Sequence, residues 1–217
     1  LTADTKGNRN VAVGAGTLGT QNFTTATSVY NVAVGYSAGN SVTTGIRNTI
    51  VGGLAGDAIT TGANNAAFGY GALTTNILGS KSTAIGTAAL LDQNPATAVD
   101  MYNTAVGYEA GKGVTTGVKN TVMGGLAGDL LTTGGSNVII GYNSGTSGTN
   151  LITGTGNVLL GSDADASASD SDYANVIGYD VTGAGGYTTL GKSGDDIRAA
   201  HGTATWATVS DERYKKD

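Results

Sequence analysis

A short pattern recurs along almost the whole chain. It has the form Asn-x-apolar-apolar-Gly, and its ten copies follow one another at a nearly constant spacing. A fixed period of about 20 residues is typical of repeat architectures, in which each unit stacks only on its neighbours. The copies begin at Asn10, Asn31, Asn48, Asn65, Ser82, Asn103, Asn120, Asn137, Asn157 and, in shortened form, Asn175.

A longer period is superimposed on the short one. The sequence Gly-Gly-Leu-Ala-Gly-Asp occurs at 52–57 and again, four copies later, at 124–129. We therefore interpret residues 10–81 as a block that was duplicated into 82–153. The predicted organisation is a lead-in at 1–9, solenoid repeats at 10–161, an irregular insertion and last rungs at 162–194, and a junction at 195–217 to a C-terminal chaperone that this chain lacks.

Each copy predicts a β-strand of about four residues that ends at a glycine. β-Branched residues favour strands, and glycine allows the tight turn that follows. A helical solenoid is the competing fold, but the chain has 37 glycines, and each one inside a helix would cost about 1 kcal/mol. The pattern favours strands.

Both faces of the predicted strands are apolar. Ala33 and Val34 are neighbours in one strand, and neighbouring strand residues point to opposite faces. One face fills the coil, together with the alanines three residues after each glycine; these are Ala38, Ala55, Ala72, Ala89, Ala110 and Ala127. The other face needs a partner, which identical chains around a three-fold axis would supply. The predicted fold is thus all-β: a parallel β-solenoid of about ten short rungs, assembled as an elongated homotrimer.

Composition argues against several classes of function. The net charge is −5, only 12% of residues are charged, and no run of Lys and Arg follows an aromatic pattern, so nucleic acid is not an expected partner. No apolar run approaches the roughly 20 residues of a membrane helix, and we expect no membrane insertion. With no cysteine and one histidine, His201, we expect no cofactor and no conventional enzyme. His201 would bind a metal only if it faced a three-fold axis.

The string Asn-Thr-Ala-Val-Gly-Tyr-Glu-Ala-Gly at 103–111, followed by Thr-Thr-Gly and another Asn-Thr, resembles the repeats of phage tail-fibre and tailspike proteins. It is also similar to the head repeats of trimeric autotransporter adhesins. Both resemblances span roughly residues 8–180, and both imply parallel β-rolls or β-helices that assemble as trimers.

The C-terminal sequence distinguishes these two families. Residues 206–215, Trp-Ala-Thr-Val-Ser-Asp-Glu-Arg-Tyr-Lys, look like the junction to the intramolecular chaperone of endosialidase-type tailspikes, which begins Ser-Asp-x-Arg-x-Lys. The resemblance implies that Ser210 is the nucleophile of self-cleavage and Lys215 its base, a pairing that a desolvated lysine makes chemically reasonable. Without the chaperone the pair is expected to be inert. The alternative is a charged, solvated tail with a helix-cap sequence. The first residue is Leu1, which suggests a fragment of a longer parent chain.

Three sets of residues are candidates for binding. A tyrosine follows the glycine in alternate rungs, and such a row would either stack on the rings of a surface glycan or only cover the corner of the coil; its members are Tyr36, Tyr70, Tyr108 and Tyr142. Paired threonines precede a later glycine, where they would bind a flat ligand or stack between rungs; they are Thr43-Thr44, Thr60-Thr61, Thr115-Thr116 and Thr132-Thr133. Four carboxylates would either hold Ca²⁺ or lie in a solvated, mobile insertion; they are Asp163, Asp165, Asp170 and Asp172.

Together these features predict a structural shaft or host-recognition segment of a trimeric phage tail fibre or spike, extracellular and part of the virion. Its expected partners are two further copies of the chain, other tail proteins and a cell-surface glycan. The alternative is the head of a trimeric autotransporter adhesin on a bacterial surface. A glycan depolymerase is a third hypothesis, which requires paired carboxylates on adjacent rungs; Asp57 and Asp129, which lie in separate blocks, do not meet that requirement.

Overall fold

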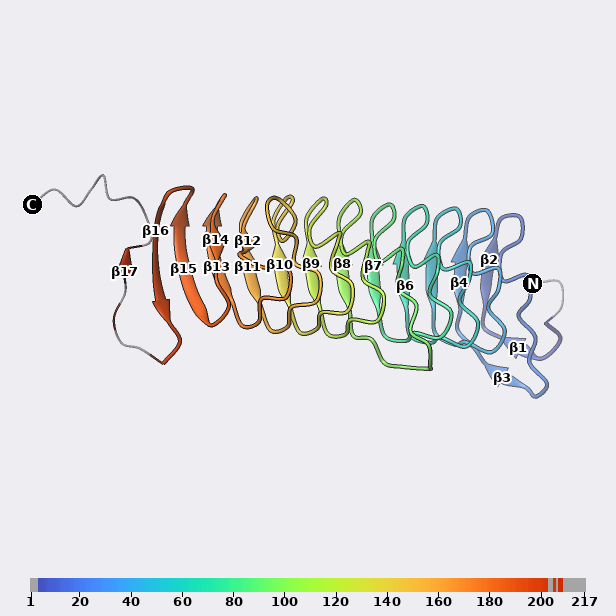
Figure 1. Ribbon diagram of the computed structural model, residues 1–217. Helices are drawn as coiled ribbons and strands as arrows, with labels where there is room; N and C mark the ends of the chain where they lie inside the picture. Colours follow the sequence, from blue (N-terminus) through green and yellow to red (C-terminus); the bar gives the residue numbers. More distant parts are fainter. Residues whose placement is uncertain (1–3, 203–204, 206, 209–217) are drawn as a thin grey trace, which may run out of the picture.

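The computed structural model describes residues 4–202, 205 and 207–208. Over this part the chain winds into a long coil of short strands joined by turns, and its two ends lie at opposite ends of the coil (Figure 1). No helix that could span a membrane is found among the described residues. The strands are β1 (Gly7–Asn8), β2 (Val11–Val13), β3 (Thr27–Ser28), β4 (Val32–Val34), β5 (Thr49–Val51), β6 (Ala66–Phe68), β7 (Thr83–Ile85), β8 (Thr104–Val106), β9 (Thr121–Met123), β10 (Val138–Ile140), β11 (Val158–Leu160), β12 (Asp165–Ala166), β13 (Asn175–Tyr179), β14 (Thr182–Gly183), β15 (Tyr187–Lys192), β16 (Asp195–Ala200) and β17 (Ala207–Thr208).

One sheet runs the length of the molecule and forms the first wall of the coil. It has thirteen strands in the order β17-β16-β15-β13-β11-β10-β9-β8-β7-β6-β5-β4-β2. The strands from β2 to β15 are parallel, and each pairs with the same part of the next repeat; Ile50, for example, lies between Ala33 and Ala67. This confirms the predicted parallel β-solenoid. Most strands contain three residues, one fewer than expected, because both the asparagine and the glycine of the repeated motif lie outside the strand.

We number the rungs from the copy that begins at Asn10. The strand register corrects the tenth copy, because Val176 pairs with Leu159 and Asn157 is therefore matched by Ala174. The last copy is thus of full length, with alanine in place of asparagine. Asn175 lies one position later, in the strand.

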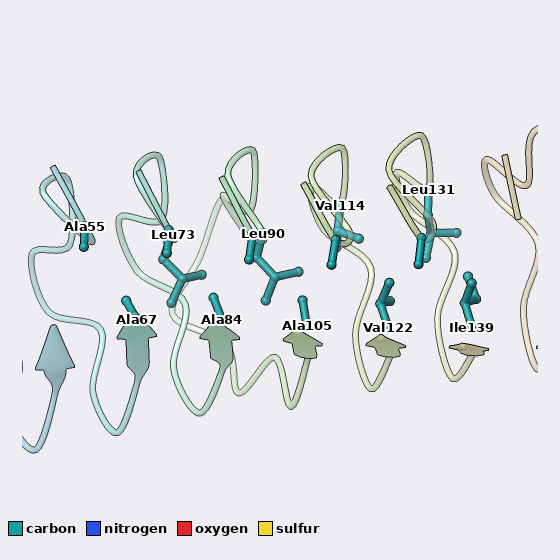
Figure 2. Packing of buried hydrophobic residues seen from close by; sticks show 14 of the residues in the cluster. Ala55, Ala67, Leu73, Ala84, Leu90, Ala105, Val114, Val122, Leu131 and Ile139 are labelled. Atoms are coloured by element: carbon teal, nitrogen blue, oxygen red, sulfur yellow. The ribbon is translucent and has the colours of Figure 1, made fainter. Parts of the chain in front are cut away.

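The core is a narrow layer between the strand wall and a second wall (Figure 2). The strand wall contributes the middle residue of each strand, such as Ala67 or Ile139, and the second wall contributes the predicted alanines, such as Ala55. All six of those alanines are fully buried, which confirms their predicted place inside the coil.

The second wall fills the core in two alternative ways. Where the residue after the buried alanine is leucine, as in Leu73 and Leu90, the position three residues later is polar: Asn76 and Gln93. Where it is glycine, as in Gly56, that later position is aliphatic. A Cβ on Gly56 would lie 2.8 Å from the Cδ1 atom of Ile59, so the two sites cannot both be filled. The core stays filled from rung to rung although the source of its side chains changes.

The repeat's asparagines form a buried ladder along the inside of the coil. Asn48 donates through Nδ2 to the carbonyl of Gly62 at 2.9 Å, and its Oδ1 accepts the backbone N–H of Asn65 at 3.0 Å. Equivalent bonds to the returning loop or to the next rung are made by Asn31, Asn65, Asn103, Asn120, Asn137 and Asn157. Buried backbone groups need such partners. The regular spacing of asparagine therefore has a structural cause.

Two further features shape each turn. The glycine that closes each copy of the repeated motif has a φ of about +126° to +149°, and a Cβ on Gly69 would lie 2.4 Å from the carbonyl oxygen of Gly86 in the next rung. In addition, the residue just before the ladder position has a left-handed conformation in every rung, for example Arg47 at φ 57° and Lys119 at φ 62°. These two backbone conformations allow the chain to complete each turn of the coil within about 20 residues.

The coil continues through residues 162–192, which contain β12, β13, β14 and β15. The expectation of a solvated, mobile insertion is wrong for Asp165, because it is buried and its Oδ2 accepts the N–H of Gly148 at 2.6 Å. β16 then turns back antiparallel to β15. It covers the open edge that a parallel coil would otherwise present.

Candidate functional site

The outer face of the strand wall carries four parallel rows of side chains, one residue per rung in each row. Two rows come from the strands, one from the residue just before the ladder position, and one from the residue after the strand-ending glycine. Because paired strands are about 4.8 Å apart, successive members of a row are separated by that distance.

The predicted tyrosine row lies along one edge of this face. Tyr36, Tyr70, Tyr108 and Tyr142 occupy every second rung and are 67, 62, 56 and 60% exposed. The register adds Tyr179 in the tenth rung. The rings of Tyr70 and Tyr142 cover glycines of the preceding rungs, since a Cβ on Gly53 or Gly125 would lie 3.5 or 3.6 Å from them. The tyrosines are thus both corner covers and an exposed aromatic row, and their proposed role in glycan binding stays a prediction.

The strands supply an outward apolar row, and no member of it is fully buried. Ile85 is 42% exposed and Phe68 is 38% exposed. The complete row is Val13, Val34, Val51, Phe68, Ile85, Val106, Met123, Ile140, Leu160 and Ile177. It is a continuous apolar ridge on the side of the sheet that faces away from the core.

A row that sequence analysis missed lies at the opposite edge, just before the ladder residues. In rungs one to eight it contains only exposed polar or aromatic side chains, and we name it the alternating row: Arg9, Tyr30, Arg47, Asn64, Lys81, Tyr102, Lys119 and Ser136. Backbone bonds hold its members in line; the N–H of Arg47 donates to Val29 and that of Lys119 to Met101, at 2.9 and 2.8 Å. The sequence of these eight rungs holds no run of Lys and Arg, but the coil brings single cations and tyrosines into line along this edge. The expected absence of nucleic acid binding stays a prediction.

Two pairs in the alternating row are in direct contact. The guanidinium of Arg9 lies 5.2 Å from the centre of the Tyr30 ring and donates to its hydroxyl. The ammonium of Lys81 lies 5.1 Å from the centre of the Tyr102 ring and also contacts Asp100 at 2.6 Å. The hydrogen bond to Asp100 raises the pKa of Lys81 above its ordinary value. Cations over aromatic faces are attracted by the ring quadrupole, so each tyrosine helps to fix its cation.

Two further acidic residues lie on the second wall. Asp57 and Asp129 occupy equivalent positions in the two duplicated blocks, and Oδ1 of each is buried without a hydrogen-bond partner among the described residues. Burial raises the pKa of both carboxyls above the ordinary value. They are four rungs apart, about 19 Å, and do not form the paired carboxylates of a glycosidase.

The threonine pairs have a structural use. Thr43 and Thr60 donate through Oγ1 to the carbonyls of Thr60 and Ile77 in the next rungs, each at 3.2 Å. Thr115 and Thr132 repeat this contact. The first threonine of each pair therefore joins rungs, while the second is exposed.

The carboxylates proposed for calcium have separate partners. Asp163 accepts from Asn143 Nδ2, Asp165 from Gly148 and Asp172 from the N–H of Thr155. Within the described ranges, no three His, Asp or Glu side chains form a group that could hold a metal ion, and no pocket is present.

The remaining candidates lie near or beyond the C-terminal end of the coil. His201 lies 3.3 Å from both Asn175 Nδ2 and Thr188 Oγ1. Ser210 and Lys215 lie outside the described residues.

Comparison with known proteins gives no match. No family model, no curated protein and no solved structure matches the chain.

Proposed function

We propose that the chain is a shaft segment of a homotrimeric extracellular fibre of the phage tail-fibre or tailspike kind. The observation that supports this proposal best is the outward apolar row, which runs without interruption along ten rungs. Contiguous exposed apolar surface of this kind is typical of an interface. The function is mechanical: the stacked rungs give a stiff rod that holds a recognition element away from the particle.

The period of the apolar row argues that its partner is a second copy of the chain. A partner has to present side chains at the same rise of about 4.8 Å per rung to pack against all ten rungs. An identical coil running in parallel has this rise by construction, and rotation about one axis repeats the contact for each copy. The three-fold arrangement follows the resemblance of the repeats, and a two-fold pair is the competing outcome.

A depolymerase gains no support from the arrangement of Asp57 and Asp129. The head of a trimeric autotransporter adhesin would have the same trimeric coil as the shaft proposed here. The resemblance of the sequence at 206–215 to the chaperone junction favours the phage family over the adhesin. We further propose that the tyrosine row, as the exposed aromatic edge of the shaft, is available to sugar rings on the host surface.

Sedimentation velocity of the 217-residue chain tests the assembly. We expect a particle with three times the chain mass. We expect Ile85→Lys to shift it to monomer at the same concentration, because an unpaired buried charge costs several kcal/mol. Thr116→Lys introduces the same charge at an exposed threonine outside the apolar row and should leave the trimer intact. A wild-type monomer would overturn the proposal.

A further inference from the structure

The alternating row has a regular chemical order along the fibre axis. Rungs one, three, five and seven present a cation, and rungs two, four, six and eight present a neutral hydrogen-bonding side chain. Neighbouring cations are therefore about 10 Å apart, twice the rung spacing. The eight side chains are all exposed.

The internal duplication provides a comparison between two copies of this row. The offset between the two blocks relates Arg9 to Lys81, Tyr30 to Tyr102, Arg47 to Lys119 and Asn64 to Ser136, and the chemical class is kept each time. Each of these rungs has two other left-handed positions. The one four residues after the strand-ending glycine is largely kept, as in Leu18 and Leu90, and its leucines are buried in the core. The one two residues after the strand-ending glycine lacks this consistency. There the same offset relates Gly16 to Ala88, Ser37 to Glu109, Leu54 to Leu126 and Gly71 to Asn143. The chemical order of the alternating row has therefore been kept between the two blocks, although its side chains are exposed and do not fill the core.

Contacts inside the coil do not account for all of these side chains. Arg9 and Lys81 are held by Tyr30 and Tyr102, and Lys81 also by Asp100. For Arg47 and Lys119, the structure records no ion pair or side-chain hydrogen bond within residues 4–202. Glycine would suit their left-handed backbone better than a long side chain. Strained residues that are nevertheless retained point to an external role.

The spacing identifies the kind of ligand. One strand of DNA carries a phosphate about every 3.4 Å, so cations about 10 Å apart would meet roughly one phosphate in three. Single-stranded nucleic acid also needs aromatic side chains under successive bases, whereas Tyr30 and Tyr102 are four rungs apart. A linear polysaccharide in which an acidic sugar alternates with a neutral one matches both the order and the spacing, because a rung is close to the length of one sugar in an extended chain.

We propose that the alternating row binds a linear acidic polysaccharide whose charged and neutral sugars alternate, with Arg47 and Lys119 meeting carboxylates and the intervening Tyr, Asn and Ser side chains meeting neutral sugars. This inference rests on the proposed surface fibre, because such a fibre meets the polysaccharides of a cell envelope. The row lies at the edge of the apolar face, and the trimer has to leave it open.

Hyaluronan is a suitable probe, because a carboxylated sugar alternates with a neutral one along its chain. We would measure its dissociation constant by titration calorimetry with the wild-type chain, an Arg47→Gln/Lys119→Gln variant, and a Lys112→Gln/Lys192→Gln control with the same change in charge outside the row. We expect the row variant to bind about tenfold more weakly and the control less than twofold more weakly. Carboxyl-reduced hyaluronan should not bind, and polygalacturonate and poly(dT) should bind more weakly than hyaluronan.

Several results would overturn the inference: equal binding by wild type and row variant, an equal loss in the control, or tighter binding of poly(dT) or polygalacturonate. Sedimentation of the same samples separates this inference from the proposed assembly. A wild-type trimer that ignores hyaluronan refutes only the inference, whereas a monomer that binds it through the row refutes only the trimer. A row variant that loses the trimer shows that the row packs between chains, which also overturns the inference.

Discussion

The asparagine ladder gives a prediction whose magnitude follows from the structure. In Asn48→Ala, the carbonyl of Gly62 loses its donor at 2.9 Å and the N–H of Asn65 loses its acceptor at 3.0 Å. Asn48 is fully buried, so water cannot replace either partner without opening the coil. Each buried backbone group left without a partner costs about 1–3 kcal/mol. We therefore expect the free energy of unfolding to fall by about 3–5 kcal/mol.

The assay combines urea denaturation with hydrogen exchange. A stacked array is able to open locally, so the exchange rate of the Asn65 N–H reports the broken bond directly, and it should rise strongly in Asn48→Ala. Asn22→Ala is the control, because Asn22 is exposed and surface substitutions usually change stability by less than about 0.5 kcal/mol. A loss below about 1 kcal/mol with unchanged protection of Asn65 would refute the structural role of the ladder.

Three further substitutions test other parts of the coil. Gly52→Ala should lower the free energy of unfolding by more than about 3 kcal/mol, measured by thermal unfolding, because its Cβ would lie 2.4 Å from the Gly69 carbonyl oxygen. Gly53→Ala is the control and should be tolerated, because a Cβ on Gly53 meets only the Tyr70 ring at 3.5 Å. Equal effects of the two substitutions would contradict the stacking of the glycine row. Burial raises the folded-state pKa of Asp57 and Asp129, so wild type should lose stability as pH rises from the unfolded value of about 3.9 through the folded one. Asp57→Asn/Asp129→Asn should remove that loss of stability. If the free energy of unfolding depended on pH in the same way in the wild type and in this variant, the prediction would be wrong. Lys119→Gly should raise the free energy of unfolding by about 1 kcal/mol, since it relieves a left-handed backbone, and should weaken hyaluronan binding; a destabilised variant would show that the Lys119 side chain supports the fold.

The fold could be predicted from sequence because its requirements are local and repeated. Gly69 has to be glycine for a steric reason, Asn48 has to be asparagine for its two hydrogen bonds, and Ala55 has to be small to face the strand wall. Each requirement recurs in almost every rung, so the repeats alone reveal it. The tenth rung was misaligned because Ala174 replaces the asparagine that marks the other rungs.

The surface was harder to predict, because neighbours on it are far apart in sequence. Arg47 and Lys81 lie close together on one edge of the sheet. In the sequence, however, all the residues of two complete turns of the coil stand between them. The turns differ in length, so no fixed spacing reveals the row. Aligning the residue just before each ladder asparagine would have found it. That residue looks like part of a variable loop until its left-handed conformation and its backbone bond to the preceding rung are known.

That left-handed corner connects the architecture to the proposed binding surface. Each non-glycine residue there costs about 1–2 kcal/mol relative to a relaxed backbone, and the N–H bond to the preceding rung, such as the 3.0 Å bond from Asn64 to Ile46, offsets part of that cost. A purely structural corner would be expected to use glycine, as the position after β2 and after each strand from β4 to β11 does. In rungs one to eight the corner before the ladder never does, and its side chains alternate between cations and neutral donors or acceptors. If the alternating row only turned the chain, Lys119→Gly would stabilise the protein and leave hyaluronan binding unchanged. We expect instead that the variant is more stable but binds hyaluronan more weakly.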